Sequence, residues 1–93
     1  MPTKMAFVYI IKNKKNDCFY LGCSNNPELR LKTYHNAGRV KATKGYIPWR
    51  LVFKQKCKSA TQARQIEYKL KSMKSKRILK QIVDEQNCRL IND

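Results

Sequence analysis

Two short stretches in the first quarter of the chain carry β-branched and aromatic residues at the density that is typical of β-strands. These stretches are residues 5–12 and 17–22, and the polar residues 13–16 between them suit a hairpin turn. A third stretch of the same kind covers residues 49–56 and follows a proline. The pattern therefore predicts a hairpin and one further strand.

The register of the hairpin decides which side chains are neighbours. If Lys12 pairs with Asp17 across the four-residue loop, Tyr9 lies directly opposite Tyr20. Directly opposed residues of an antiparallel pair point to the same face of the sheet. This register predicts two phenols side by side.

A first helix is predicted between the hairpin and the third strand. Asn26 is a favoured N-cap residue, Pro27 fits the first helical turn, and Glu28 suits the positive end of the helix dipole. We expect the helix to continue to about Ala37, where Gly38 can end it.

Two more helices are predicted in the second half of the chain. Residues 59–62 match a capping box that opens one helix, and a further helix is predicted over residues 75–85. Apolar residues recur at helical spacing in both segments. In the first they are Ala60, Ala63, Ile66 and Leu70, and in the second they are Ile78, Leu79, Ile82 and Val83.

The resulting order is ββαβαα. This order predicts an α+β fold in which helices flank a small three-stranded antiparallel sheet. A chain of 93 residues has little room for a second hydrophobic core. We therefore expect a single domain over residues 1–93, with a core from about residue 6 to 83.

The charge balance narrows the choice of partner. Lys and Arg number 21 against six Asp and Glu, which gives a net charge of +15. Between Cys18 and Val83 the only acidic residues are Glu28 and Glu67. A field of one sign on this scale favours polyanions, and nucleic acid above the others. A ribosomal or RNA-coating protein, an acidic lipid surface, and charge without a polyanionic partner are the alternatives.

The cysteines give no sign of a metal or disulfide framework. No two of the four have the C-x-x-C spacing of a zinc site, and the single histidine, His35, is distant from them in sequence. The apolar run at residues 5–11 is too short for a signal peptide core or a membrane span. We expect a cytoplasmic protein with free thiols at Cys18, Cys23, Cys57 and Cys88.

Glu67 is the most informative single residue. It lies four residues after Ala63 and three before Leu70, so it shares their inward stripe. A carboxylate is rarely buried alone, because its desolvation is costly. Two interpretations remain open from position alone, namely a structural ion pair and a metal ligand.

The other polar candidates are weaker on their own. Arg30 shares a helix face with Tyr34 four residues later, which is often only packing. Tyr9 and Tyr20 are ordinary strand aromatics, and we expect His35 at the surface.

Taken together, these residues resemble the GIY-YIG nuclease family. Residues 7–9 (Phe-Val-Tyr) stand where the family has Gly-Ile-Tyr, and residues 20–22 (Tyr-Leu-Gly) stand for Tyr-Ile-Gly. Arg30 and Glu67 follow in the order of the family's helix arginine and metal-binding glutamate. Residues 46–53 are similar to the "PW-LV" strand of the small stand-alone bacterial members.

The resemblance implies a metal-dependent endonuclease that hydrolyses DNA phosphodiester bonds. Glu67 would hold Mg²⁺ or Mn²⁺. Tyr20 or Tyr9 would orient or deprotonate the attacking water, and Arg30 would stabilise the charge that develops on the phosphate. A non-catalytic DNA- or RNA-binding module on the same fold is the alternative.

The chain also departs from the family pattern. Many members have a histidine four residues after the arginine, where Tyr34 stands here, and His35 is displaced by one position. A tyrosine at that place resembles the incision nucleases of excision repair, which implies a part for Tyr34. Cys23 stands where that branch has lysine, and Leu79 where an asparagine is frequent. These differences favour a stand-alone member.

The expected partner is DNA, branched and single-stranded forms included, with RNA as an alternative and no membrane. We expect low sequence specificity, because phosphate contacts carry no sequence information. The oligomeric state stays open. The residues expected to contact nucleic acid are Arg30, His35, Arg39, Lys41, Lys44, Lys69, Lys71, Lys74 and Lys76.

Overall fold

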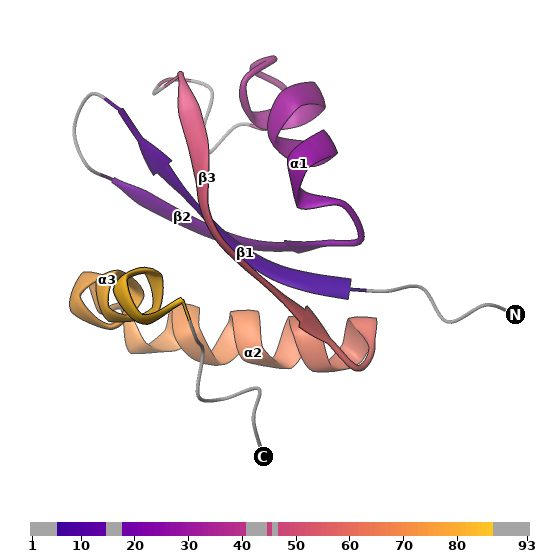
Figure 1. Cartoon of the computed structure of the whole chain (residues 1–93), viewed down its shortest axis with the longest axis vertical. Helices are drawn as coiled ribbons and strands as arrows, with labels where there is room; N and C mark the ends of the chain where they lie inside the picture. Colours follow the sequence, from indigo (N-terminus) through magenta and orange to yellow (C-terminus); the bar gives the residue numbers. More distant parts are fainter. Residues whose placement is uncertain (1–5, 15–17, 41–44, 46, 87–93) are drawn as a thin grey trace, which may run out of the picture.

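The computed structural model describes residues 6–14, 18–40, 45 and 47–86. Its described part confirms the predicted order and fold class, with three antiparallel strands in the sheet order β2-β1-β3. Figure 1 shows α1 on one side of this sheet and α2 with α3 on the other. The elements are β1 (Ala6–Asn13), β2 (Phe19–Ser24), α1 (Pro27–Arg30), the π-helical η1 (Leu31–His35), β3 (Trp49–Cys57), α2 (Ala60–Met73) and α3 (Lys76–Glu85).

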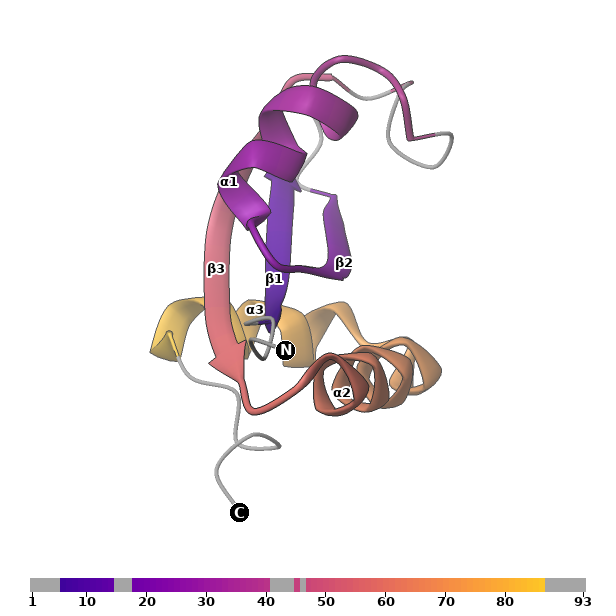
Figure 2. The same cartoon turned by 90° about the vertical axis from the view of Figure 1, so that its right-hand side faces the viewer.

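Each face of the sheet has its own apolar cluster, because successive side chains of a strand alternate between faces. The larger cluster joins the sheet to α2 and α3, and the smaller lies under α1 and η1, which Figure 2 shows at the end of the molecule away from α2. The buried members of the larger cluster are Ala6, Val8, Ile10, Leu21, Phe53, Cys57, Ala63, Ile66, Leu70 and Ile82. Those of the smaller cluster are Tyr9, Ile11 and Trp49.

The hairpin register differs from the predicted one. Lys12 pairs with Phe19 and not with Asp17, so Tyr9 lies opposite Gly22 and Tyr20 lies opposite Ile11. The direct pairing of the two tyrosines was therefore wrong. Because the register differs by two residues and side chains repeat every two residues, both tyrosines still point to the same face. The aromatic pair is diagonal rather than opposed.

Gly22 is required by the tyrosine that lies over it. A Cβ atom built on Gly22 would stand 2.6 Å from the hydroxyl oxygen and 2.7 Å from the Cζ atom of Tyr9. Tyr9 is only 1% exposed, so its ring has no free space to move into. The glycine of the Tyr-Leu-Gly motif thus makes room for the phenol of the neighbouring strand.

The first helix begins as predicted but does not stay α-helical. The side chain of Asn26 accepts a hydrogen bond from the amide of Leu29, and Pro27 opens the first turn. The chain then widens into a π-turn, in which the amide of Asn36 donates to the carbonyl of Leu31 over 2.8 Å. Gly38 follows with a φ of 77°, which agrees with its predicted role at the helix end.

The two later helices are capped by serines. Ser59 accepts from the amide of Gln62 and Ser75 from the amide of Ile78, and Lys74 separates the helices in a left-handed conformation with a φ of 48°. Of the predicted inward residues of α2, only Ala60 in the first turn is exposed. No helix of the described residues is long and apolar enough to cross a membrane.

We expect Gly22→Ala to lower the free energy of unfolding by about 1–3 kcal/mol, because the added methyl group overlaps a buried ring that cannot move aside. Gly45→Ala is the matched control, since nothing lies within 4 Å of its added Cβ. Urea unfolding of both variants measures the difference. Equal stability of the two variants would contradict the close packing of Tyr9 on Gly22.

Candidate active site

A buried hydrogen bond joins β1 to η1 at the centre of the smaller cluster. The hydroxyl group of Tyr9 lies 2.8 Å from Nε2 of His35, and the two residues are 1% and 0% exposed. Burial raises the pKa of Tyr9 to about 12, although the nearby Arg30 guanidinium opposes this rise. Burial and then the Arg30 charge lower the pKa of His35 to about 4. Both groups are therefore neutral at neutral pH.

The position of His35 corrects two expectations. It is neither at the surface nor open to direct contact with nucleic acid, because its side chain is fully buried. The cause is the π-turn. In a regular α-helix, a residue five positions after Arg30 would lie about 140° around the axis from it. The wider turn over residues 31–35 brings His35 inward to Tyr9 instead.

Arg30 packs against Tyr34, the residue four positions after it. Its guanidinium carbon is 4.9 Å from the ring centroid of Tyr34, which is 42% exposed. Its Nε is buried, and among the described residues it has no hydrogen-bond partner. A buried donor without a partner is costly, about 1–3 kcal/mol. The structure therefore leaves one hydrogen-bond donor of this guanidinium unused by its neighbours.

Tyr20 connects the buried pair to α2. Its ring centroid lies 5.1 Å from that of His35 and 6.5 Å from that of Trp49, in edge-to-face geometry. The ammonium group of Lys71 on α2 lies 5.5 Å from the same ring. Tyr20 is half-buried, so solvent reaches part of its side chain.

Glu67 is only partly buried, with 20% of its side chain exposed. Its Oε1 accepts a hydrogen bond from the thiol of Cys23 over 3.2 Å, and its Oε2 lies 2.8 Å from the Lys71 ammonium. Burial, followed by the hydrogen bond and charge of Glu67, raises the pKa of Cys23 to about 11. Burial lowers the pKa of Lys71, but its contacts with Glu67 outweigh burial and raise the pKa overall.

These side chains meet at one edge of the sheet. β2 is an edge strand, and Tyr20 and Cys23 point to opposite faces of it because they are three residues apart. Glu67 reaches β2 from the α2 side, and Arg30 with His35 reaches it from the other side. The charge of Glu67 and the phenol of Tyr20 both act on Tyr9. The structure thus brings Tyr9, Tyr20, Arg30 and Glu67 together around β2.

The donor atoms fit one kind of metal site. Among the described residues, no group of three or more His, Cys, Asp or Glu could enclose an ion. Glu67 offers hard carboxylate oxygens, and its partner Lys71 has 49% of its side chain exposed, so the ammonium has room to turn away. Mg²⁺ commonly binds through one or two carboxylates and takes its other ligands from water and phosphate. The site fits an ion bound in that way.

Most of the other basic residues that were expected to contact nucleic acid are exposed in the described part of the chain. Arg39 is exposed beyond η1, and four exposed lysines lie on or beside α2 and at the start of α3. Lys41 and Lys44 lie outside the described residues. The four exposed lysines are Lys69, Lys71, Lys74 and Lys76.

Cys23 was not among the predicted site residues, although it contacts Glu67 directly. Its position next to the motif glycine was the available signal. Nothing in the sequence pattern indicated that the thiol reaches the glutamate, because that contact depends on how α2 packs against β2.

Comparison with known proteins identifies the class. The family model described as the GIY-YIG catalytic domain matches residues 5–80, and the chain belongs to this family. It is 39% identical over 77 residues to UPF0213 protein SH2523 of Staphylococcus haemolyticus (strain JCSC1435), covering 82% of this chain and 92% of that protein. It is 30% identical over 89 residues to UPF0213 protein YazA of Bacillus subtilis (strain 168), covering 96% and 89%. No solved structure gives a significant match.

The buried histidine predicts a dependence of stability on pH. An unfolded His35 has its ordinary pKa near 6.5 and takes up a proton as the pH falls below this value, whereas the folded residue resists protonation down to about pH 4. Stability is therefore greatest above pH 6.5 and falls through this window. From pH 7 to pH 5 we expect a loss of about 2 kcal/mol in the free energy of unfolding.

Urea unfolding at both pH values measures this loss, and His35→Gln is the control that should remove most of it. His35 is the only histidine of the chain, so no second imidazole contributes. If the wild type and His35→Gln lose the same stability between pH 7 and pH 5, His35 is not buried in its neutral form.

Proposed function

We propose that this protein is a metal-dependent endonuclease that hydrolyses DNA phosphodiester bonds with low sequence specificity. The observation that supports the proposal most is the meeting of Tyr20, Arg30 and Glu67 around one edge strand. They come from β2, α1 and α2, three elements that are distant in sequence. They supply a phenol, a guanidinium whose buried Nε has no hydrogen-bond partner among the described residues, and a carboxylate.

Tyr20 is the residue that we assign to the attacking water. Tyr9 is only 1% exposed, its hydroxyl already bonds to His35, and its pKa is about 12. A water molecule has no access to it, and the phenol holds its proton firmly. Tyr20 is half-buried, and its ring lies beside the Lys71 ammonium. A water molecule can therefore contact this phenol, as its orientation or proton transfer requires.

Tyr9 and His35 are positioning residues in this proposal. Their hydrogen bond holds η1 against β1, and the His35 ring in turn supports the edge of Tyr20. Arg30, which begins the same turn, is held with its guanidinium near the pair. Its role is to donate hydrogen bonds to a phosphate oxygen as negative charge develops there.

Glu67 is the residue that would hold Mg²⁺ or Mn²⁺. A divalent ion held there would supply positive charge to a phosphate oxygen and would lower the pKa of bound water. The protein contributes the carboxylate and the Cys23 thiol, which donates to Oε1 and fixes the orientation of the group. Lys71 must leave Oε2 or share it when an ion is bound.

One observation favours the alternative of a non-catalytic DNA- or RNA-binding module. Glu67 already has a cationic partner, so its charge is compensated without any metal ion. In a binding module this ion pair would be permanent, and Glu67 would serve only to attach α2 to β2. The two functions predict different consequences for removal of the carboxylate.

We expect Glu67→Gln to lower the rate of DNA cleavage by at least about 100-fold in the presence of Mg²⁺ or Mn²⁺. Loss of a mere supporting partner of a metal ligand costs about 10–100-fold, and Glu67 is the ligand itself. The assay follows the nicking of supercoiled plasmid and of flapped and single-stranded DNA. Adding excess EDTA to the wild type should stop cleavage to the same extent.

Glu28→Gln is the matched control for this assay. It makes the same change of charge at an exposed carboxylate that pairs with Lys54 on β3. It should cleave at close to the wild-type rate. Cleavage that survives Glu67→Gln unchanged, or no cleavage by the wild type on any of these substrates, would contradict the nuclease proposal and favour the binding module.

A further inference from the structure

A basic groove begins beside Tyr20 and follows the edge of β2 toward α3. It encloses about 420 Å³, and its floor is apolar while its rim carries three lysines and no acidic residue. Lys71, the partner of Glu67, is one of the three. The groove is lined by Cys18, Phe19, Tyr20, Leu21, Leu70, Lys71, Lys74, Ser75, Lys76 and Leu79.

The register of the sheet places a row of three residues at the far end of this groove. Lys12 pairs with Phe19 on one side and with Arg50 on the other, so the three lie in line across β2, β1 and β3. Directly paired residues point to the same face, which here is the face covered by α2 and α3. The helix α3, which starts at Lys76, therefore lies over this row.

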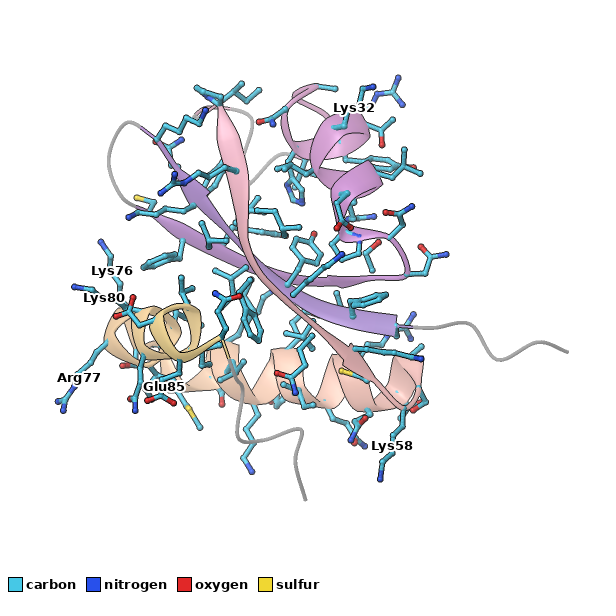
Figure 3. The ribbon with its side chains drawn as sticks, viewed as in Figure 1. Lys32, Lys58, Lys76, Arg77, Lys80 and Glu85 are labelled. Atoms are coloured by element: carbon cyan, nitrogen blue, oxygen red, sulfur yellow. The ribbon has the colours of Figure 1, made fainter. Side chains whose placement is uncertain are left out.

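A second hollow of about 330 Å³ lies between this row and α3. Lys76 and Lys80 are one helical turn apart and border it together, and Figure 3 shows them projecting from α3 on the same side. Asp84, the next residue at this spacing, is its single carboxylate. The hollow is lined by Lys12, Phe19, Arg50, Val52, Lys76, Lys80, Val83 and Asp84.

The two hollows adjoin each other, because Phe19 and Lys76 line both of them, and together they make up the basic groove. The Phe19 ring lies at the junction, with the ammonium groups of Lys12 and Lys76 at 5.8 and 5.9 Å from its centroid. The first turn of α3 also begins here, and the positive end of its helix dipole favours an anion. Along its length the groove has six cationic side chains and one carboxylate.

We propose that this groove holds one strand of the nucleic acid and leads it away from Tyr20 to a second phosphate site at Arg50 and Lys80. Successive phosphates lie against the cationic rim, and a base or sugar rests on the Phe19 ring. An aromatic floor between cations suits a nucleotide chain, whereas a membrane surface calls for an exposed apolar face. The proposal rests on the proposed function only in taking Tyr20 as the place of cleavage.

The test uses the full chain and fluorescein-labelled oligodeoxynucleotides of about 4 and about 16 nucleotides, which bracket the usual site size of a single-strand groove. Binding is followed by fluorescence anisotropy in EDTA, so that no cleavage occurs. The groove variant is Arg50→Gln with Lys80→Gln. The control is Lys32→Gln with Lys58→Gln, which loses the same charge at exposed residues that Figure 3 shows well away from Lys80.

We expect the groove variant to bind the long oligonucleotide about 10-fold more weakly than the wild type, with little change for the short one. The slope of log affinity against log salt should fall by about 1.4, since two phosphate contacts are lost at about 0.7 each. The control variant should stay within about 2-fold of the wild type on both oligonucleotides. Circular dichroism checks that both variants are folded.

Equal losses in the groove and control variants would overturn the proposal, because net charge alone would then explain binding. No binding of either oligonucleotide by the wild type would also overturn it. The nuclease proposal is tested separately, since these measurements contain no divalent ion. If the wild type does not cleave DNA but the groove variant shows the length-dependent loss of binding, the groove proposal stands and the nuclease proposal fails. If the wild type cleaves DNA but the groove variant shows no such loss, the nuclease proposal stands and the groove proposal fails.

Discussion

The hydroxyl group of Tyr9 sets the constraint on which the rest of the site depends. A phenol this deeply buried needs a hydrogen-bond partner, because an unsatisfied hydroxyl costs about 1–3 kcal/mol. His35 is that partner, and it reaches Tyr9 only because the helix widens into a π-turn. The ring of Tyr9 in turn leaves no space for a Cβ at Gly22. One buried polar group thus explains a helix irregularity and the motif glycine.

The same contact determines where chemistry is possible. Because η1 is held against β1, Arg30 is presented to the interior with a buried donor, and the His35 ring supports Tyr20. Tyr20 lies on an edge strand, where groups from both faces of the sheet can approach it. Glu67 and Lys71 approach from the α2 side. The proposed active site and the basic groove are therefore adjacent, and Lys71 belongs to both.

Much of the fold could be predicted from local signals. The capping box that begins at Ser59 and the spacing of apolar residues located α2 and α3, because such signals act within one or two turns. The hairpin register was wrong by two residues, because a shift of two leaves every side chain on the same face and the hydrophobic pattern cannot distinguish the two registers. His35 was misplaced because its sequence spacing suits an α-helix with a solvent-facing residue at that point. The row of Lys12, Phe19 and Arg50 depends on that register and could not be anticipated.

The central claim is that Glu67 exchanges its Lys71 partner for a divalent ion when a phosphate is bound. The most direct measurement is an electron paramagnetic resonance titration of Mn²⁺ in the presence of a phosphorothioate oligonucleotide, which resists hydrolysis. The account predicts that the wild-type protein with the oligonucleotide binds one Mn²⁺ more than the oligonucleotide alone, and that Glu67→Gln does not. Equal Mn²⁺ binding by the two proteins would contradict it.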